Sequence, residues 1–325
     1  MRILVTNFKA AETDTVLTAQ TLAEAEGEGS LATGATVIKP SDALHYRADG
    51  QRHCIGYWQL KAEGGFTEVP CPWGNRIKKG TQCYRCGRAD ESWQIHNTTR
   101  EQASPTLTSY LDRPHFLYVA VFADGSLKVG TSRSARKLSR WIEQGAVMTV
   151  RLGEYADGWE VREAENLASK QGGIKQAVRT VTKAKGFLSD VTVGQLAGEL
   201  ADTATEIAGL LDAYGLRGEA VGNELGSLGA SLPEALAGLA DMDPWVNPVA
   251  IKHLGEPLPA YPHELTTGEH NLELVDLVGT TAFVRINEPP EGAFDLAALS
   301  GEESEQLYVA NFAQLKAFEL EQIDA

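Results

Sequence analysis

The four cysteines of this 325-residue chain, Cys54, Cys71, Cys83 and Cys86, lie close together in the sequence and could bind one metal ion. Two residues separate Cys83 from Cys86, a spacing at which both thiolates can reach the same ion. The small Gly87 that follows leaves room for backbone amides to face the sulfur atoms. Four thiolates around an ion leave no position for water, so the sequence predicts a structural zinc site.

Two other interpretations of these cysteines stay open. The thiols could be buried or redox-active, with Cys83 and Cys86 as a disulfide pair, or His53 or His96 could replace one cysteine as a ligand. Spaced cysteines in a cytoplasmic protein indicate metal more often than disulfides. Residues 1–9 read as a strand rather than a signal peptide, and no run of 18 apolar residues occurs, so we expect a cytoplasmic protein outside the membrane.

A second group of candidate residues lies around the strongest hairpin signal of the sequence, Asp124-Gly125 between two β-rich runs. Cleavage of a phosphodiester needs a group that activates water, a cation that stabilises the pentavalent phosphate and a metal ion that neutralises developing charge. Tyr118 could orient or deprotonate the water, Arg140 could clamp phosphate oxygens, and Lys128 could assist.

The metal ligand for this chemistry would come from a later acidic helix. Glu160, Glu163 and Glu165 all lie in it, and one carboxylate could hold Mg²⁺ through a single oxygen. We favour Glu165, although the phase of the helix decides between it and Glu163. The alternative for all three is an ordinary solvated helix face, just as Tyr118 could be a strand aromatic and Gln144-Gly145 a helix C-cap.

The elements that must position these residues can be read from local patterns. Strands are expected over 115–122, 126–132 and 147–155, and helices over 135–144 and 159–170. Apolar residues at three- and four-residue spacing predict a further amphipathic helix over 192–214, which Gly215 ends.

The chain as a whole reads as an α+β protein of several units. We expect a β-rich N-terminal segment at residues 1–50, a zinc-ribbon-like segment at 51–110 and a small sheet with helices at 111–188. A helical region at 189–241 and an acidic β-rich unit at 242–325, with strands over 272–278, 281–286 and 307–312, complete the chain.

The charge is distributed unevenly along these units. The net charge of −15 alone argues against a nucleic-acid partner, but residues 128–188 carry 12 Lys or Arg and 6 Asp or Glu, whereas residues 189–325 carry 4 and 24. The acidic part could be an ordinary solvated surface. The basic part coincides with the candidate site and predicts a nucleic-acid partner, either DNA or RNA. The oligomeric state does not follow from the sequence.

Two families share motifs with residues 50–190. Leu117-Tyr118 and the Lys128-Val129-Gly130 that follows, with the later Arg140 and Glu165, resemble the GIY-YIG nuclease superfamily. The stretches Lys128 to Ser132 and Arg140 to Ala146, with Cys71-Pro72 and Gln82-Cys83-Tyr84-Arg85-Cys86, resemble the DUF2797 family more closely.

The nuclease resemblance implies a small sheet with helices on which Arg140 is the catalytic arginine and Glu165 the metal-binding glutamate. Lys128 stands where that superfamily has a second, catalytic tyrosine, and Phe116-Leu117 replaces a glycine-isoleucine pair. The lysine matters because its ammonium group can bind phosphate as a point charge but acts as a general base only if its pKa is strongly lowered.

Three functions are therefore expected. The first is a Mg²⁺-dependent endonuclease. The second is a non-catalytic, zinc-containing module that contacts the nucleic-acid backbone. Its contacts would come from Lys128, Arg133, Arg136, Lys137 and Arg140. The third is an interaction scaffold whose acidic C-terminal half docks a basic partner or folds back over the basic segment.

Overall fold

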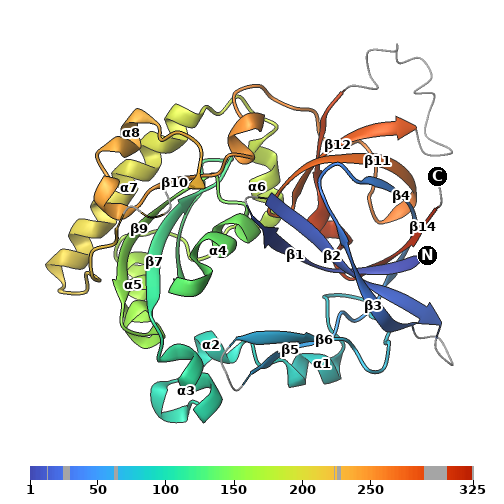
Figure 1. Cartoon of the computed structure of the whole chain (residues 1–325), viewed down its shortest axis with the longest axis horizontal. Helices are drawn as coiled ribbons and strands as arrows, with labels where there is room; N and C mark the ends of the chain where they lie inside the picture. The colour runs from blue at the N-terminus through green and yellow to red at the C-terminus, as the bar shows by residue number, and fades with distance from the viewer. Residues whose placement is uncertain are drawn as a thin grey trace.

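The computed structural model of the protein describes residues 1–12, 14–24, 30–61, 65–222, 224, 228–288 and 306–323. Within these ranges the chain forms two larger antiparallel sheets, a separate two-stranded hairpin and a small number of helices (Figure 1). This mixed α/β architecture with antiparallel sheets agrees with the general class expected from the sequence.

The larger sheet is built from both ends of the chain. Its eight described strands follow the order β13-β12-β11-β4-β14-β1-β2-β3. They are β1 (Arg2–Ala11), β2 (Asp14–Glu24), β3 (Ser30–Ile38), β4 (Ala43–Arg52), β11 (Thr267–Val278), β12 (Thr281–Glu288), β13 (Tyr308–Asn311) and β14 (Phe318–Gln322). Because β14 lies between β1 and β4, the β-rich segments at residues 1–50 and 242–325 share one sheet.

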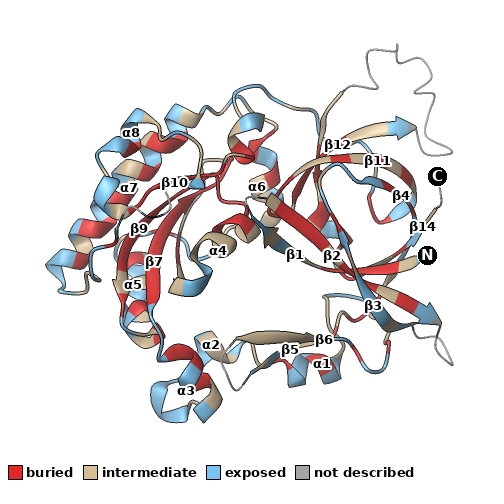
Figure 2. Ribbon diagram, in the orientation of Figure 1, coloured by how far each residue is buried: buried red, intermediate tan, exposed pale blue. Residues whose placement is uncertain are grey.

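The core of this sheet follows from the period of two in its strands. In β4, the buried Leu44, Tyr46 and Ala48 alternate with the more exposed His45 and Arg47. Alternate side chains of a strand point to the same face, so the buried set meets apolar residues of the other strands on one side of the sheet (Figure 2).

The cysteine segment forms a small unit of its own between β4 and the second sheet. Its elements are β5 (Tyr57–Leu60), β6 (Phe66–Val69), α1 (Tyr84–Ala89), α2 (Gln94–Asn97), a 3-10 turn (Arg100–Gln102) and α3 (Pro105–Leu111). At the start of α3 the hydroxyl of Ser104 accepts a hydrogen bond from the amide of Leu107 at 3.2 Å, and Pro105 occupies the first helical position.

The second sheet contains the predicted hairpin. Its described strands follow the order β10-β9-β7-β8, namely β7 (His115–Val121), β8 (Leu127–Arg133), β9 (Met148–Tyr155) and β10 (Trp245–Val246). Every residue of β7 is buried because helices cover both faces of the sheet. Phe116 and Tyr118 belong to an aromatic cluster with Trp141, whereas Leu117 and Val119 belong to the main core.

The helices around this sheet include those expected over 135–144, 159–170 and 192–214. They are α4 (Lys137–Gln144), which follows a 3-10 turn (Ser134–Arg136), α5 (Gly158–Lys170), α6 (Thr180–Gly186), α7 (Val193–Ala213) and α8 (Glu234–Ala237). Short 3-10 turns lie at Ala240–Met242, Ala250–His253 and Phe312–Leu315. Thr192 and Gln195 form a capping box at the start of α7. None of the described helices combines the length and apolarity that a membrane crossing needs.

Helix α4 connects the two sheets. Its C-cap, Gly145, has a φ of 68°, and a Cβ atom there would lie 2.7 Å from the carbonyl oxygen of Val278 in the larger sheet. The hydroxyl of Thr15 in β2 donates to the carbonyl of Ile142 at 3.4 Å and accepts from the amide of Gly279 at 3.0 Å. Only glycine allows this close approach, and Gly145 is the C-cap of α4, which the sequence left open as an alternative interpretation of Gln144-Gly145.

Candidate functional site

The four predicted site residues come from four consecutive elements of the second sheet. Tyr118 lies on β7, Lys128 on β8, Arg140 on α4 and Glu165 on α5. Tyr118 and Lys128 meet at Gln144, and the charges of Arg140 and Glu165 both act on these two residues. The tight turn at Gly125, with a φ of 78°, sets the register that places Tyr118 opposite Gly130.

Tyr118 is completely buried, with a side chain that faces the site from the sheet. Its hydroxyl donates to Oε1 of Gln144 at 3.2 Å. Burial raises the pKa of Tyr118, and this effect outweighs that of the Arg140 charge, which acts to lower it. The phenol therefore stays protonated at neutral pH and acts as a hydrogen-bond donor to Gln144 rather than as a base.

Lys128 shares the same acceptor. Its Nζ atom donates to Oε1 of Gln144 at 3.1 Å. Burial, together with the positive charge of Arg140, lowers the pKa of Lys128 to about 8, although Glu165 acts in the opposite direction. Gln144, which the sequence indicated only as a position near a helix end, thus links the two candidate residues on the hairpin.

The phase of α5 distinguishes the three glutamates. Glu160 and Glu163 are exposed, whereas Glu165 is half-buried and faces the cations of the site. Burial raises the pKa of Glu165, and Lys128, Arg162 and Arg140 oppose that effect. The side chain of Asp157 caps the helix by accepting from the amides of Trp159 and Glu160, which fixes where its first turn begins.

Two further cations complete the site and were not found in the sequence. Nζ of Lys183, on α6, donates to the carbonyl of Gln144 at 2.7 Å and lies 3.9 Å from the ring centre of Phe122. Burial, with the charges of Lys128 and Arg140, lowers the pKa of Lys183 to about 7. Arg162 lies on α5 and interacts with Glu165.

The guanidinium of Arg162 is only partly satisfied by the protein. Its Nη1 atom donates to the carbonyl of Thr98 at 3.3 Å, while Nη2 is buried and has no hydrogen-bond partner among the described residues. A buried cationic donor without an acceptor is costly, because it has lost its water without gaining a partner. An anion in the site would supply that acceptor.

A cavity of about 460 Å³ adjoins this cluster and shares Arg140 with it. One part of its wall comes from the cysteine segment and α3, and the other from β8 and the start of α4. The pKa of His96, on the wall of the cavity, is lowered by loss of solvation and by the positive charges of Arg162, Arg140 and Lys128. The site and the cavity thus form one electropositive region.

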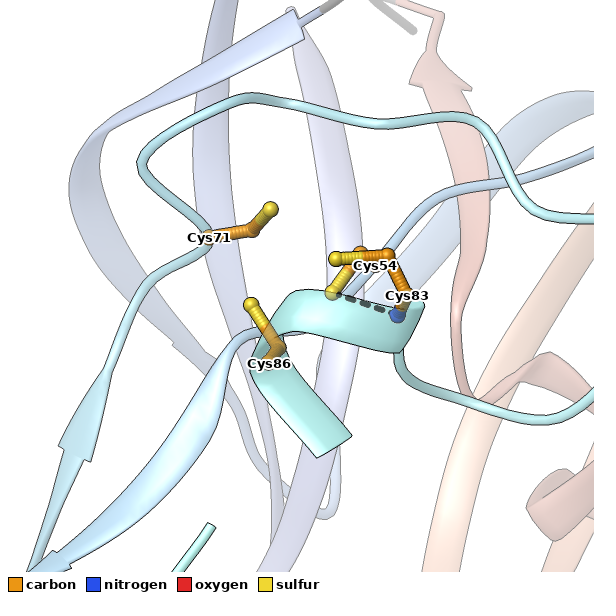
Figure 3. Close-up of side chains that lie close together, drawn as sticks. All are labelled: Cys54, Cys71, Cys83 and Cys86. Atoms are coloured by element: carbon orange, nitrogen blue, oxygen red, sulfur yellow. Dashed lines mark hydrogen bonds between the residues drawn. The ribbon is translucent and has the colours of Figure 1, made fainter. Parts of the chain in front are cut away.

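The four cysteines converge as the sequence predicted. Their sulfur atoms all lie within 4.8 Å of one another, and all four thiols are free (Figure 3). In a regular tetrahedron with zinc–sulfur bonds the sulfur atoms would be ~3.8 Å apart. The cluster could therefore hold a metal ion such as zinc, and the alternative of a Cys83–Cys86 disulfide is not realised.

Backbone amides donate to one of the cysteine sulfur atoms, Sγ of Cys54, although burial raises the pKa of that thiol to about 11. The amides of Cys83 and Gly56 donate to Sγ of Cys54 at 3.1 Å and 3.4 Å. Burial acts to raise the pKa of Cys83, but hydrogen bonds from the backbone of Cys86 and from nearby side chains lower it to about 7. Gly56 has a φ of 93°, and a Cβ atom there would lie 1.9 Å from the carbonyl oxygen of Val69, so only glycine fits beside β6.

Neither histidine belongs to this group. His53 is buried, with Nε2 at 3.1 Å from a carboxylate oxygen of Glu319 on β14. His96 faces the cavity instead. Among the described residues, the group that could hold a metal ion is the four cysteines.

Comparison with known proteins places part of the chain in a family. Residues 42–225, more than half of the chain, match the model of a family described as "Protein of unknown function (DUF2797)". No curated protein and no solved structure matches the chain. The expected family is confirmed, and the resemblance to GIY-YIG nucleases stays a prediction.

Proposed function

The chain belongs to the DUF2797 family, and from the geometry of its site we propose that it binds the phosphodiester backbone of nucleic acid and hydrolyses it with the aid of Mg²⁺. One observation carries the proposal: the positive charges of Lys128, Arg140 and Arg162 all act on Glu165, and Lys183 joins Lys128 at Gln144. The lowered pKa values of the two lysines come first from burial and then from the repulsion of neighbouring cations, and both effects penalise the charged ammonium groups. A bound phosphate would offset this penalty.

Each residue of the cluster has a separate role in the proposed reaction. Arg140 and Arg162 would bind the non-bridging phosphate oxygens, which suit the planar donors of a guanidinium. Glu165 would hold Mg²⁺ through one carboxylate oxygen, with water and phosphate oxygens as the remaining ligands. The ion, when bound, would neutralise charge that develops on the phosphate.

Lys128 is the candidate base. With a pKa of about 8, about one-tenth of its side chains are neutral at pH 7, and a neutral amine can accept a proton from water. The water oxygen then forms a bond to phosphorus, the bond from phosphorus to the leaving oxygen breaks, and solvent protonates that oxygen. Tyr118 contributes by holding Gln144, which in turn holds Lys128.

The test is Mg²⁺-dependent nicking of a supercoiled plasmid. Glu165→Gln should lower the rate by about a hundredfold or more, because the proposed Mg²⁺ ligand loses its charge. Glu163→Gln is the matched control: it changes the same group on the same helix, but at an exposed position, and should leave the rate unchanged. Arg140→Lys should lower the rate while keeping the charge. Equal rates for Glu163→Gln and Glu165→Gln would overturn the assignment.

A second candidate function, nucleic-acid binding without cleavage, is favoured by the surface of the cysteine segment. Between Cys71 and Arg88 the chain carries five exposed basic side chains and no acidic residue, and it exposes the rings of Trp73 and Tyr84. The basic residues are Arg76, Lys78, Lys79, Arg85 and Arg88. Such a surface suits contacts to phosphates and bases. Salt-sensitive binding of DNA or RNA with no nicking would select this function.

For the cysteine cluster we propose one structural zinc ion. Four thiolates would close its coordination sphere, so the ion would stabilise the segment rather than take part in hydrolysis.

A further inference from the structure

The cavity beside Arg140 has the lining of a nucleotide site. We infer that it receives an unstacked base of a nucleic-acid strand whose neighbouring phosphate lies at the cation cluster. This inference rests on the proposed phosphate-binding function of that cluster. It makes single-stranded or locally unpaired nucleic acid the substrate class.

Aromatic rings form one side of the cavity. They are Trp58, Phe66, Trp93 and Tyr110. Trp93 keeps 53 % of its surface exposed, which is unusual for so large a side chain without a partner. Every nucleobase has a flat π face that can stack on such a ring, independently of its sequence identity.

Polar and cationic groups also line the cavity. Thr131 and Ser132 of β8 contribute hydroxyl groups, and Arg133, Arg136 and Arg140 contribute guanidinium groups. The guanidinium of Arg133 lies 4.9 Å from the ring centre of Tyr110, so an arginine already stacks on one of the aromatic walls. A lining that combines aromatic rings with hydroxyl groups and guanidinium groups matches a base that carries a phosphate.

The position of the cavity argues for a strand rather than a free nucleotide. Arg140 lines the cavity and also acts on Lys128 and Tyr118, so a phosphate bound there is continuous with the cluster. A volume of about 460 Å³ lies within the range of small-molecule pockets and far below that of a duplex. A base can enter only after it has left its stack.

The experiment measures binding by the full chain without Mg²⁺, so that cleavage does not interfere. Three fluorescently labelled probes of equal length are compared: a polythymidine strand, an abasic strand with the same backbone, and a blunt duplex. We expect about tenfold tighter binding of polythymidine than of the abasic strand, since one stacked base contributes about that factor. Trp93→Ala should remove this preference, whereas Tyr214→Ala, which removes another exposed aromatic ring on the far end of α7, should retain it.

The outcomes separate this inference from the proposed function. If the polythymidine and abasic strands bind with equal affinity, and Arg140→Ala weakens the binding of both, the inference of a base site is overturned and the proposed phosphate site stands. Preference for the duplex, or equal affinity for free thymidine monophosphate and the strand, would also overturn it. Base-dependent binding by a protein that nicks no plasmid would support the inference while the hydrolytic function fails.

Discussion

The hydroxyl oxygen of Tyr118 lies 2.7 Å from the point at which a side chain on Gly130 would begin. The two residues face each other in the register of the hairpin. Because Gly130 has no Cβ atom, the phenol of Tyr118 has room beside it. The phenol in turn holds Gln144, the residue to which Lys128 also donates. The glycine acts by steric fit, since its backbone does not require a positive φ.

Replacement of this glycine tests the relationship. Gly130→Ala should push the buried Tyr118 away from Gln144 and lower the free energy of unfolding by about 1–3 kcal/mol, the usual cost of overpacking a filled core. Urea unfolding followed by tryptophan fluorescence measures the change. Gly209→Ala is the control: no atom lies within 4 Å of its Cβ position in α7, and alanine should stabilise that helix by about 0.5–1 kcal/mol. Equal effects at both positions would contradict the steric argument.

The affinity for a phosphodiester should depend on pH through two lysines. The pKa of Lys128 is about 8 and that of Lys183 about 7, both lowered mainly by burial. Phosphate binds the charged ammonium more tightly than the neutral amine, so the affinity for the strand should fall as the pH rises from 7 to 9. For each proton that binding takes up, the affinity should fall by up to about tenfold per pH unit. Anisotropy of a labelled strand at constant ionic strength measures it.

Lys128→Arg supplies the control for this dependence. Arginine keeps its charge at all these pH values, so the variant should bind with a smaller loss at pH 9 than the native chain. An identical pH profile in both proteins would show that Lys128 does not titrate in this range when the strand binds.

Elements with local signals could be predicted from the sequence. The Asp124-Gly125 turn identified the hairpin, and the apolar spacing identified α7, because both patterns arise from neighbours in the chain. The pairing of β1 with β14 could not be found in this way. Residues from opposite ends of the chain meet there, and nothing in either strand specifies its partner.

The same distinction between local and distant neighbours holds for the residues of the candidate site. Tyr118, Lys128 and Arg140 follow one another within a short stretch, so motif spacing could associate them. Glu165 was separable from Glu163 only once the rotation of α5 was known, since one residue of phase moves a side chain by about 100° around a helix. Lys183 and His96 reach the region from α6 and from the cysteine segment, and no spacing rule connects them to the hairpin.

Removal of the metal should loosen the cysteine segment. One zinc ion per chain is expected. A strong chelator should speed trypsin cleavage after the exposed Lys78, Lys79 and Arg85, because the ion would hold the backbone around the cysteines in place. Cleavage after Lys170, an exposed residue at the end of α5, is the internal control and should proceed at an unchanged rate. Complete loss of zinc with no faster cleavage at the three sites would contradict a structural role.

The ion pair between Arg151 and Asp243 should be among the most sensitive polar contacts of the second sheet. Both side chains are at most 2 % exposed, and Arg151 also donates to the carbonyl of Gly222 at 3.0 Å. Asp243→Asn keeps the shape but leaves the guanidinium charge buried without its counter-ion, at a cost of about 3–5 kcal/mol in the free energy of unfolding.

Two comparisons test the expected cost of Asp243→Asn. Glu273→Gln breaks the pair with Arg285, whose side chains are 38 % and 40 % exposed, and should cost at most about 1 kcal/mol because water replaces the lost partner. The double variant Arg151→Met with Asp243→Asn should be more stable than Asp243→Asn alone, since it removes the uncompensated charge. Urea titrations of the native chain, Glu273→Gln, Asp243→Asn, Arg151→Met and the double variant measure these differences. A double variant that loses the sum of both single effects would show that the two residues contribute independently rather than as a pair.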